Sequence, residues 1–123
     1  METMVETYKN EHGEIAVLVS GGYGAGWSTW NCDHEIAWDK RMVELYLSLT
    51  IQERRDLSKL DNDKPKSVWA RQQAAEWGYT SIYWGGFDDC SIEWVPAGKP
   101  FRINEYDGAE DLEYLDMEDW VAF

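Results

Sequence analysis

Hydrophobic residues in the first half of the chain follow two patterns. Residues 14–19 include five consecutive apolar side chains, three of them β-branched, and the run stops at the glycines 21–22. A short apolar run of this kind indicates a strand buried in the centre of a sheet. Further along, apolar side chains recur at helical spacing at Trp38, Met42, Leu45, Tyr46 and Leu49. This spacing predicts an amphipathic helix over residues 38–48.

Two further helices are predicted in the middle third of the chain. Thr50-Ile51-Gln52-Glu53 has the form of a capping box, in which the hydroxyl and the carboxylate each accept a backbone amide at a helix start. We therefore expect a second helix that runs to about Leu60. Ser67 is expected to cap a third helix over residues 68–77, and Gly78 suits the left-handed conformation that ends a helix.

The last third of the chain alternates between apolar and polar side chains with a period of two. Segments 80–84, 91–95 and 101–105 show this alternation and are separated by turn residues, which indicates an antiparallel meander. A fourth strand is expected near residues 112–115, and the apolar residues 120–123 are expected to dock back onto the domain. The pattern predicts an α+β fold. It has a single antiparallel sheet, made of the N-terminal strand and the C-terminal meander, with two to three helices on one face.

Length and composition are typical of one compact cytoplasmic domain. The 123 residues, 44% of them hydrophobic, suffice for a single domain over residues 1–123. The first residues are acidic where a secretory signal is basic, and the apolar run at 15–19 is too short to cross a membrane. Cys32 and Cys90 stand far apart, which favours reduced thiols in the cytoplasm.

The formal net charge of −13 is unevenly distributed along the chain. Residues 1–39 carry −6, residues 40–71 carry +3 and residues 72–123 carry −10. Such a field repels phosphate groups, so we expect no binding to duplex DNA or to an anionic membrane. The same field favours a basic partner protein.

The acidic excess is greatest between residues 105 and 119, which hold eight acidic residues and no basic one. Aromatic and aliphatic side chains are interleaved with these acids. The general interpretation is a solvated surface, but charge combined with apolar anchors also suits an interface that imitates a nucleic-acid strand. The expected partner-binding acidic face consists of Glu105, Asp107, Glu110, Asp111, Glu113 and Asp116.

A Gly-rich segment, residues 21–26, directly follows the first predicted strand. Glycines let the backbone approach a ligand, successive amides can bind an anion, and nearby aromatic rings can stack on a base. A second hypothesis is therefore a binding module, or sponge, for a nucleotide-like small molecule. Its expected ligand residues are Gly22, Tyr23, Gly24, Gly26, Trp27 and Trp30. The segment lacks the Lys-Ser/Thr pair of a P-loop and the dinucleotide spacing, which favours a tight turn with Trp27 and Trp30 packed on the core.

No nucleophile, base and orienting group occur at a recognisable spacing, so we predict that the chain is not an enzyme. Cys32 and His34 could join Cys90 or Asp88 in a metal site, but paired ligand spacing is absent. A plain capping segment is the favoured interpretation, and no metal or cofactor is expected. A Cys32 nucleophile activated by His34 would lack an oxyanion donor.

Two segments of the chain resemble small acidic proteins encoded by bacteriophages and prophages. They are the Gly-rich, Trp-containing segment 21–31 and the stretch Pro100–Gly108. The resemblance implies an accessory protein that disarms a host enzyme or defence system in the host cytoplasm, and it carries over no functional residue. Together with the acidic face, it leads to the first hypothesis. The chain would be a non-enzymatic protein that binds and inhibits a basic, nucleic-acid-handling host protein.

Aromatic residues are more numerous than a minimal core needs. The chain has eight tryptophans and seven tyrosines. Trp84 and Trp94 alternate with apolar neighbours and are expected to face the core. Tyr83, Trp120 and Phe123 have no evident place there, so we predict an exposed aromatic patch and a two-fold homodimer formed through it.

Overall fold

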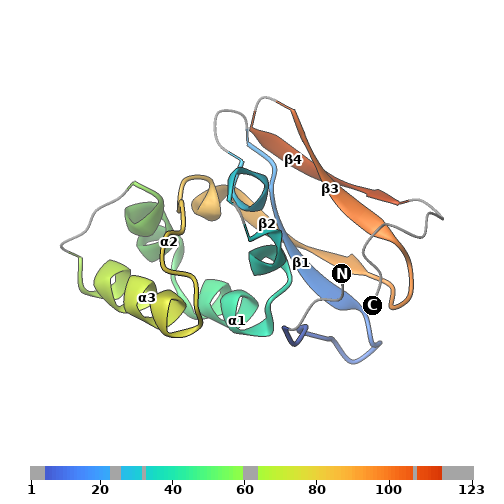
Figure 1. Cartoon of the computed structure of the whole chain (residues 1–123), viewed down its shortest axis with the longest axis horizontal. Coiled ribbons are helices and arrows are strands. Elements are labelled where there is room, and N and C mark those ends of the chain that lie inside the picture. The colour runs from blue at the N-terminus through green and yellow to red at the C-terminus, as the bar shows by residue number, and fades with distance from the viewer. Residues whose placement is uncertain (1–4, 23–25, 32, 60–63, 107, 115–123) are drawn as a thin grey trace.

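The computed structural model describes residues 5–22, 26–31, 33–59, 64–106 and 108–114 (Figure 1). Strands lie at both ends of this part of the chain, and the helices lie between them. The elements in order are β1 (Ile15–Ser20), the 3₁₀ helices η1 (Ser28–Trp30) and η2 (His34–Ala37), α1 (Lys40–Ser48), α2 (Ile51–Ser58), α3 (Pro65–Glu76), the 3₁₀ helix η3 (Phe87–Asp89), β2 (Cys90–Val95), β3 (Phe101–Tyr106) and β4 (Ala109–Tyr114). The predicted α+β class is confirmed.

The strands form two separate two-stranded antiparallel sheets, so the prediction of one sheet is wrong. β1 pairs with β2, with Ile15 opposite Val95 and Ser20 opposite Cys90. β3 pairs with β4, with Phe101 opposite Tyr114. The β3–β4 hairpin packs over β1 instead of extending its sheet, and β1 and β4 are in contact.

The two faces of β1 explain this layering. Ala16 and Leu18 face the helices, in a core that also holds Trp27 and Met42. Ile15, Val17 and Val19 face the other way, into a smaller core with Trp38, Val95, Phe101, Ile103 and Leu112. All six residues of β1 are buried, and a strand buried on both faces needs a layer on each side. The molecule therefore has three layers: helices, the β1–β2 sheet and the β3–β4 hairpin (Figure 1).

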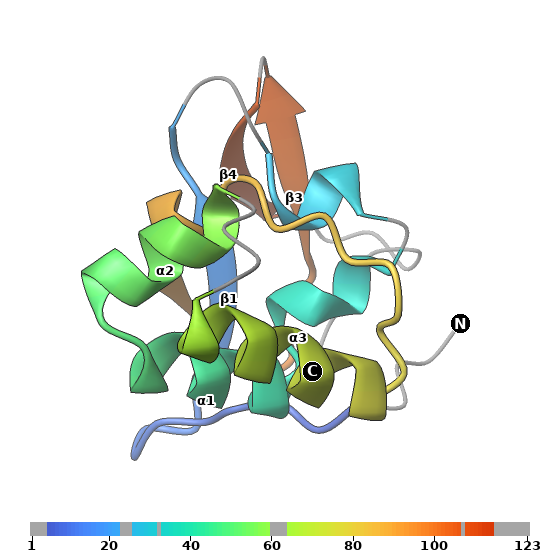
Figure 2. The ribbon, with the colours of Figure 1, turned by 90° about the vertical axis from the view of Figure 1, so that its left-hand side faces the viewer.

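Three helices cover the helical face of β1, as the view from that side shows (Figure 2). The capping box at Thr50 and Glu53 is confirmed at the start of α2. The third helix begins earlier than expected, with Pro65 in its first turn, so Ser67 lies inside the helix and does not cap it. Gly78 takes the left-handed conformation after α3, with φ of 99°, as predicted.

The predicted strand at 80–84 is wrong, because these residues form an irregular loop. Ile82 and Trp84 do turn toward the helical core, which explains the alternation in the sequence. The backbone of Tyr83, however, bonds to the side chain of Asn31 and not to a neighbouring strand. An amide side chain thus takes the place of a strand partner.

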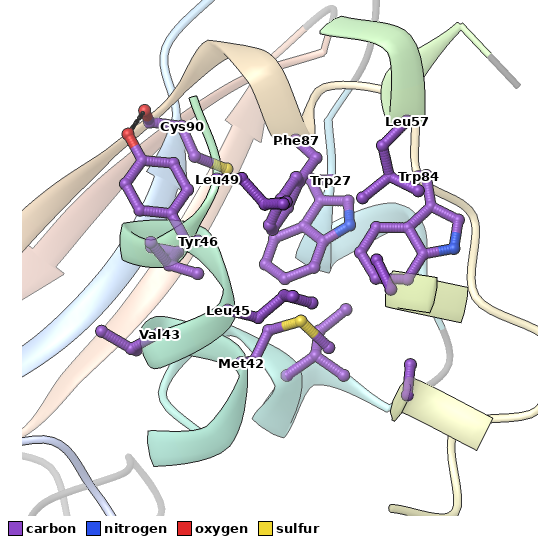
Figure 3. Close-up of a cluster of buried hydrophobic side chains, with 14 of the residues drawn as sticks. Trp27, Met42, Val43, Leu45, Tyr46, Leu49, Leu57, Trp84, Phe87 and Cys90 are labelled. Carbon is purple, nitrogen blue, oxygen red and sulfur yellow. Dashed lines mark hydrogen bonds between the residues drawn. The ribbon is translucent and has the colours of Figure 1, made fainter. Parts of the chain in front are cut away.

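The main core lies between α1, α2 and the β1–β2 sheet (Figure 3). Trp27, Trp84 and Phe87 form its aromatic centre, and the prediction that Trp84 faces the core is confirmed by its 2% exposure. Trp94 lies opposite Ala16, on the helical face of the sheet, but it is 38% exposed, so the prediction that it is a core residue is wrong. Residues 120–123, expected to dock onto the domain, lie outside the described residues. Across the part of the chain that the structure describes, no helix is both long and apolar enough to span a bilayer.

Candidate functional site

Strand alternation divides the predicted acidic face into two sides of the β3–β4 hairpin. Phe101, Ile103 and Leu112 face β1, and Glu105 and Glu110, which lie opposite each other, belong to this inner side. The outer side carries Arg102, Asn104 and Tyr106 of β3 with Asp111 and Glu113 of β4. Asp107 and Asp116 of the predicted face lie outside the described residues.

Glu110 belongs to the interior of the molecule and not to an acidic surface. It is 4% exposed, and its carboxylate accepts hydrogen bonds from the backbone amide of Ser20 (3.1 Å), the amide of Thr29 (2.9 Å) and the hydroxyl of Thr29 (2.5 Å). Ser20 and Thr29 flank the Gly-rich segment. The carboxylate therefore links Ser20 to Thr29, the residues on either side of the Gly-rich segment. Glu110 is buried and engaged there, so it is not one of the accessible partner-binding residues that the sequence predicted.

The other described acids of the predicted face stay accessible to different degrees. Asp111 is exposed on the outer side of the hairpin. Glu113 is half-buried, lies 3.6 Å from the Arg102 guanidinium and accepts a hydrogen bond from Asn104. Glu105 is exposed near the turn and accepts a hydrogen bond from the Gly108 amide at 2.6 Å. Asp111 is thus the least engaged of the described acids on the hairpin.

Trp27 and Trp30, two of the predicted ligand residues, lie in different environments. Trp27 is fully buried between Trp84 and Phe87, with ring centroids 6.4 Å and 4.9 Å away, so it cannot stack on a ligand (Figure 3). Trp30, in contrast, is 46% exposed, so the interpretation that packs both tryptophans on the core holds only for Trp27. Tyr23 and Gly24 lie outside the described residues.

A carboxylate lies beside the Gly-rich segment. A Cβ placed on Gly22 would lie 2.7 Å from Oδ2 of Asp89, so the backbone there passes close to a negative charge. A Cβ on Gly26 would meet the Thr29 hydroxyl at 2.8 Å. A larger residue at either position would have to displace these side chains, and the neighbouring carboxylate disfavours a phosphate group at Gly22.

Trp30 stacks on Tyr83, with ring centroids 5.7 Å apart and an interplanar angle of 28°. Tyr83 is 38% exposed, which agrees with the prediction that it has no place in the core. The buried amide of Asn31 holds the two loops together. It donates to the carbonyls of Trp27 (2.8 Å) and Tyr83 (3.0 Å) and accepts from the Tyr83 amide (2.9 Å). Sequence analysis missed this role of Asn31, since a lone asparagine after a tryptophan carries no signal.

A cavity of about 260 Å³ lies between η1, η2 and β3. Its walls are mainly apolar, and its volume is below the range of typical small-molecule sites. Among the described residues that line it, Arg102 is the one lysine or arginine, and its guanidinium lies 3.6 Å from Glu113. The lining residues are Ser28, Thr29, His34, Trp38, Phe101, Arg102 and Ile103.

Asp39 is the most buried described carboxylate, with 1% exposure. It accepts hydrogen bonds from the Arg41 amide (2.9 Å), from the Arg41 guanidinium (3.1 and 2.8 Å) and from the Tyr79 hydroxyl (2.7 Å). Burial alone raises the pKa of Asp39, but these bonds outweigh it, so the pKa lies below its ordinary value. Burial and the carboxylate together raise the pKa of Tyr79 well above its ordinary value. The cluster joins α1 to the loop after α3 and is structural.

The candidate metal or thiol site is not assembled by the described residues. Among them, no group of three or more potential ligands lies close enough to hold a metal ion. Cys90 is buried, its thiol faces the Gly86 carbonyl at 3.5 Å, and burial raises the pKa of that thiol. His34 is exposed, and Cys32 lies outside the described residues.

Comparisons with known proteins return no relatives. No protein-family model, no curated protein and no solved structure matches the chain.

Proposed function

We propose that the chain is a non-enzymatic binding protein that captures and inhibits a basic, nucleic-acid-handling protein through its acidic β3–β4 side. In the context that its phage-like segments imply, the partner belongs to the host cell. The proposal rests on one observation, the separation of charge between the two ends of the molecule.

The described residues of α2 and α3 and their flanks, 51–59 and 64–76, carry six basic and three acidic residues. The described residues from β2 to β4, 90–106 and 108–114, carry two basic and five acidic residues. The helices and the β3–β4 hairpin lie at opposite ends of the long axis (Figure 1). A basic partner is therefore steered to the hairpin end and oriented by the same field.

Nucleotide binding is the weaker candidate. Trp27 is buried, Asp89 lies against Gly22, and Arg102, the one described arginine or lysine that lines the neighbouring cavity, is engaged with Glu113. A phosphate group would meet the carboxylate of Asp89 at Gly22 and that of Glu113 at Arg102.

Charge change on the hairpin tests the proposal. Asp111→Lys with Glu113→Gln adds three positive charges to the outer side and leaves the buried Glu110 intact. The immobilised wild-type protein should capture basic, nucleic-acid-binding proteins from bacterial lysate at low salt, and added duplex DNA should release them by competition. The hairpin variant should lose most of this capture, because the exposed negative charge that attracts a basic partner is removed. Added salt should weaken the capture by the wild type, because it screens the same charge.

The matched control places the same change at the helical end. Glu44→Lys with Glu76→Gln also adds three charges, at two exposed helical residues. This control should keep the capture. Loss of capture in both variants, or in neither, would contradict the proposal, as would captured proteins that duplex DNA does not displace.

A further inference from the structure

Trp30 and Tyr83 form a stacked pair of rings at the surface, which we call the aromatic platform. Trp30 ends η1 and Tyr83 lies 53 residues later in the loop 80–84, and both side chains remain more than a third exposed. Exposed tryptophan and tyrosine are the side chains most enriched at the energetic centres of interfaces, where they pair with arginine. The platform is therefore a candidate interaction surface.

The platform is held in place by its surroundings. The side chain of Asn31 fixes the backbone of Tyr83 with two hydrogen bonds: it donates to the Tyr83 carbonyl and accepts from the Tyr83 N–H. A Cβ on Gly85 would lie 2.2 Å from the Tyr83 hydroxyl, and one on Gly26 would lie 3.0 Å from the Trp30 indole. The two glycines thus leave the space in which the rings lie. A platform built this way loses little conformational entropy when a partner binds.

Two other exposed rings, Trp69 and Tyr114, are covered by lysines of the chain itself, whereas no lysine or arginine that the structure describes lies over Trp94 or Tyr106. Lys66 lies over Trp69 at 4.8 Å, and Lys99 lies over Tyr114 at 4.5 Å. Among the described residues, none of the chain's lysine or arginine side chains lies over Trp30 or Tyr83. The aromatic platform is thus an open cation-binding surface on a protein of net charge −13.

We infer that the aromatic platform is the anchor for an arginine side chain of the basic partner. This inference rests on the proposed function and specifies the partner's chemistry. Arginine suits the platform because its planar guanidinium stacks on aromatic faces and is more weakly hydrated than the ammonium of lysine. The charge next to the platform agrees, because Asp33, three residues after Trp30 in sequence, is exposed.

A nucleic-acid base is the other flat group that aromatic rings bind. The chain's charge disfavours it, because a base brings a phosphate with it and the chain carries a formal net charge of −13. Arginine is therefore the favoured ligand of the platform.

The test uses a short fluorescein-labelled peptide of alternating arginine and glycine, with fluorescence anisotropy as the readout. A matched lysine–glycine peptide and a labelled thymidine oligomer serve as comparison probes. We expect the wild-type protein to bind the arginine peptide more tightly than the lysine peptide, and the oligomer not at all.

Trp30→Ala should weaken binding of the arginine peptide roughly 3- to 30-fold, as expected for loss of a cation–π contact. Trp30→Phe should retain part of the affinity. Gly85→Ala should weaken binding in the same direction, since it displaces the Tyr83 ring from Trp30. The control Trp69→Ala removes a ring of similar exposure, 39% against 46%, on α3 and should bind like the wild type.

The hairpin variant Asp111→Lys/Glu113→Gln, tested on the same peptide, separates this inference from the proposed function. If only the hairpin variant weakens binding, the platform inference is overturned and the acidic-face proposal stands. If only the Trp30 variants do, the platform stands and the acidic-face proposal falls. Equal losses for the lysine peptide overturn the preference for arginine, and tight binding of the oligomer that Trp30→Ala abolishes shows base stacking instead.

Discussion

Glu110 differs from its neighbours in the acidic run because its carboxylate satisfies three donors in the interior. Its removal leaves the buried amide of Ser20 and the partly buried amide of Thr29 without their acceptor. We expect Glu110→Ala to lower the free energy of unfolding by about 3 kcal/mol, measured by urea denaturation, since these bonds involve a charged acceptor.

Asp111→Ala is the matched control for this change, one residue further along β4. Asp111 is exposed, so the substitution should change stability by less than about 0.5 kcal/mol. The loss of stability for Glu110→Gln should fall between those of the two alanine variants. The amide oxygen of glutamine still accepts a hydrogen bond, but its NH₂ group is a donor placed against another donor. Equal stability of the two alanine variants would show that the hydrogen bonds from Ser20 and Thr29 to Glu110 do not stabilise the fold.

The burial of Glu110 was in part readable from the sequence. The turn residues Asp107-Gly108 fix the pairing of the hairpin, and alternation back from Leu112 places residue 110 on the inner side. The hydrogen-bond partners of Glu110 were not readable, because Ser20 and Thr29 are about 90 and 81 positions away. Local pattern predicts which face a side chain takes but not what it meets there.

At the scale of elements, the sequence predicts most strands and helices but not how the sheets are arranged. The strands β2, β3 and β4 and the three helices fall close to their expected positions. The division into two sheets depends on β1 being covered on both faces, which a short apolar run suggests but does not assign to a particular partner. The alternation wrongly predicts a strand at 80–84. The Asn31 side chain there makes the hydrogen bonds to the Tyr83 backbone that a neighbouring strand would otherwise make.

The Asp39 cluster ties α1 to the loop that follows α3, and its pH dependence is predictable. The pKa of Asp39 is depressed in the folded state, below its ordinary value of 3.8. The carboxylate therefore contributes stability that is fully present well above this value and is lost as the pH falls through the folded-state pKa. Asp39→Asn removes this contribution while keeping the shape of the side chain.

Urea unfolding of the wild type and of Asp39→Asn, measured between about pH 2 and pH 6, checks this sign. The wild type should be more stable than Asp39→Asn, by the largest amount near the upper end of this pH range. The difference should shrink as the pH falls and Asp39 becomes protonated. Asp33→Asn, at an exposed position, should match the wild type throughout. A difference that stays constant, or that grows on acidification, would show that the Asp39 charge is not stabilised by Arg41 and Tyr79.

At the scale of the whole molecule, charge and aromatic surface come together at one end. The β3–β4 hairpin, whose outer side carries the exposed Asp111, contacts η1, and η1 carries Trp30 of the aromatic platform. Basic residues gather at the other end, on α2 and α3 (Figure 1). A partner that is both basic and rich in arginine therefore meets attraction and anchoring at the same place. The predicted homodimer would compete for this surface through Tyr83, and it stays a prediction.

The most direct measurement is a two-dimensional NMR titration of the nitrogen-labelled protein with the arginine–glycine peptide. The account predicts that the shifting signals include the Trp30 indole N–H and the backbone amides around Tyr83 and Asp111. The Trp69 indole and the amides of α3 should stay in place. Shifts confined to α3, or spread evenly over every exposed acidic residue with the Trp30 indole unmoved, would contradict the claim that one built surface receives the partner.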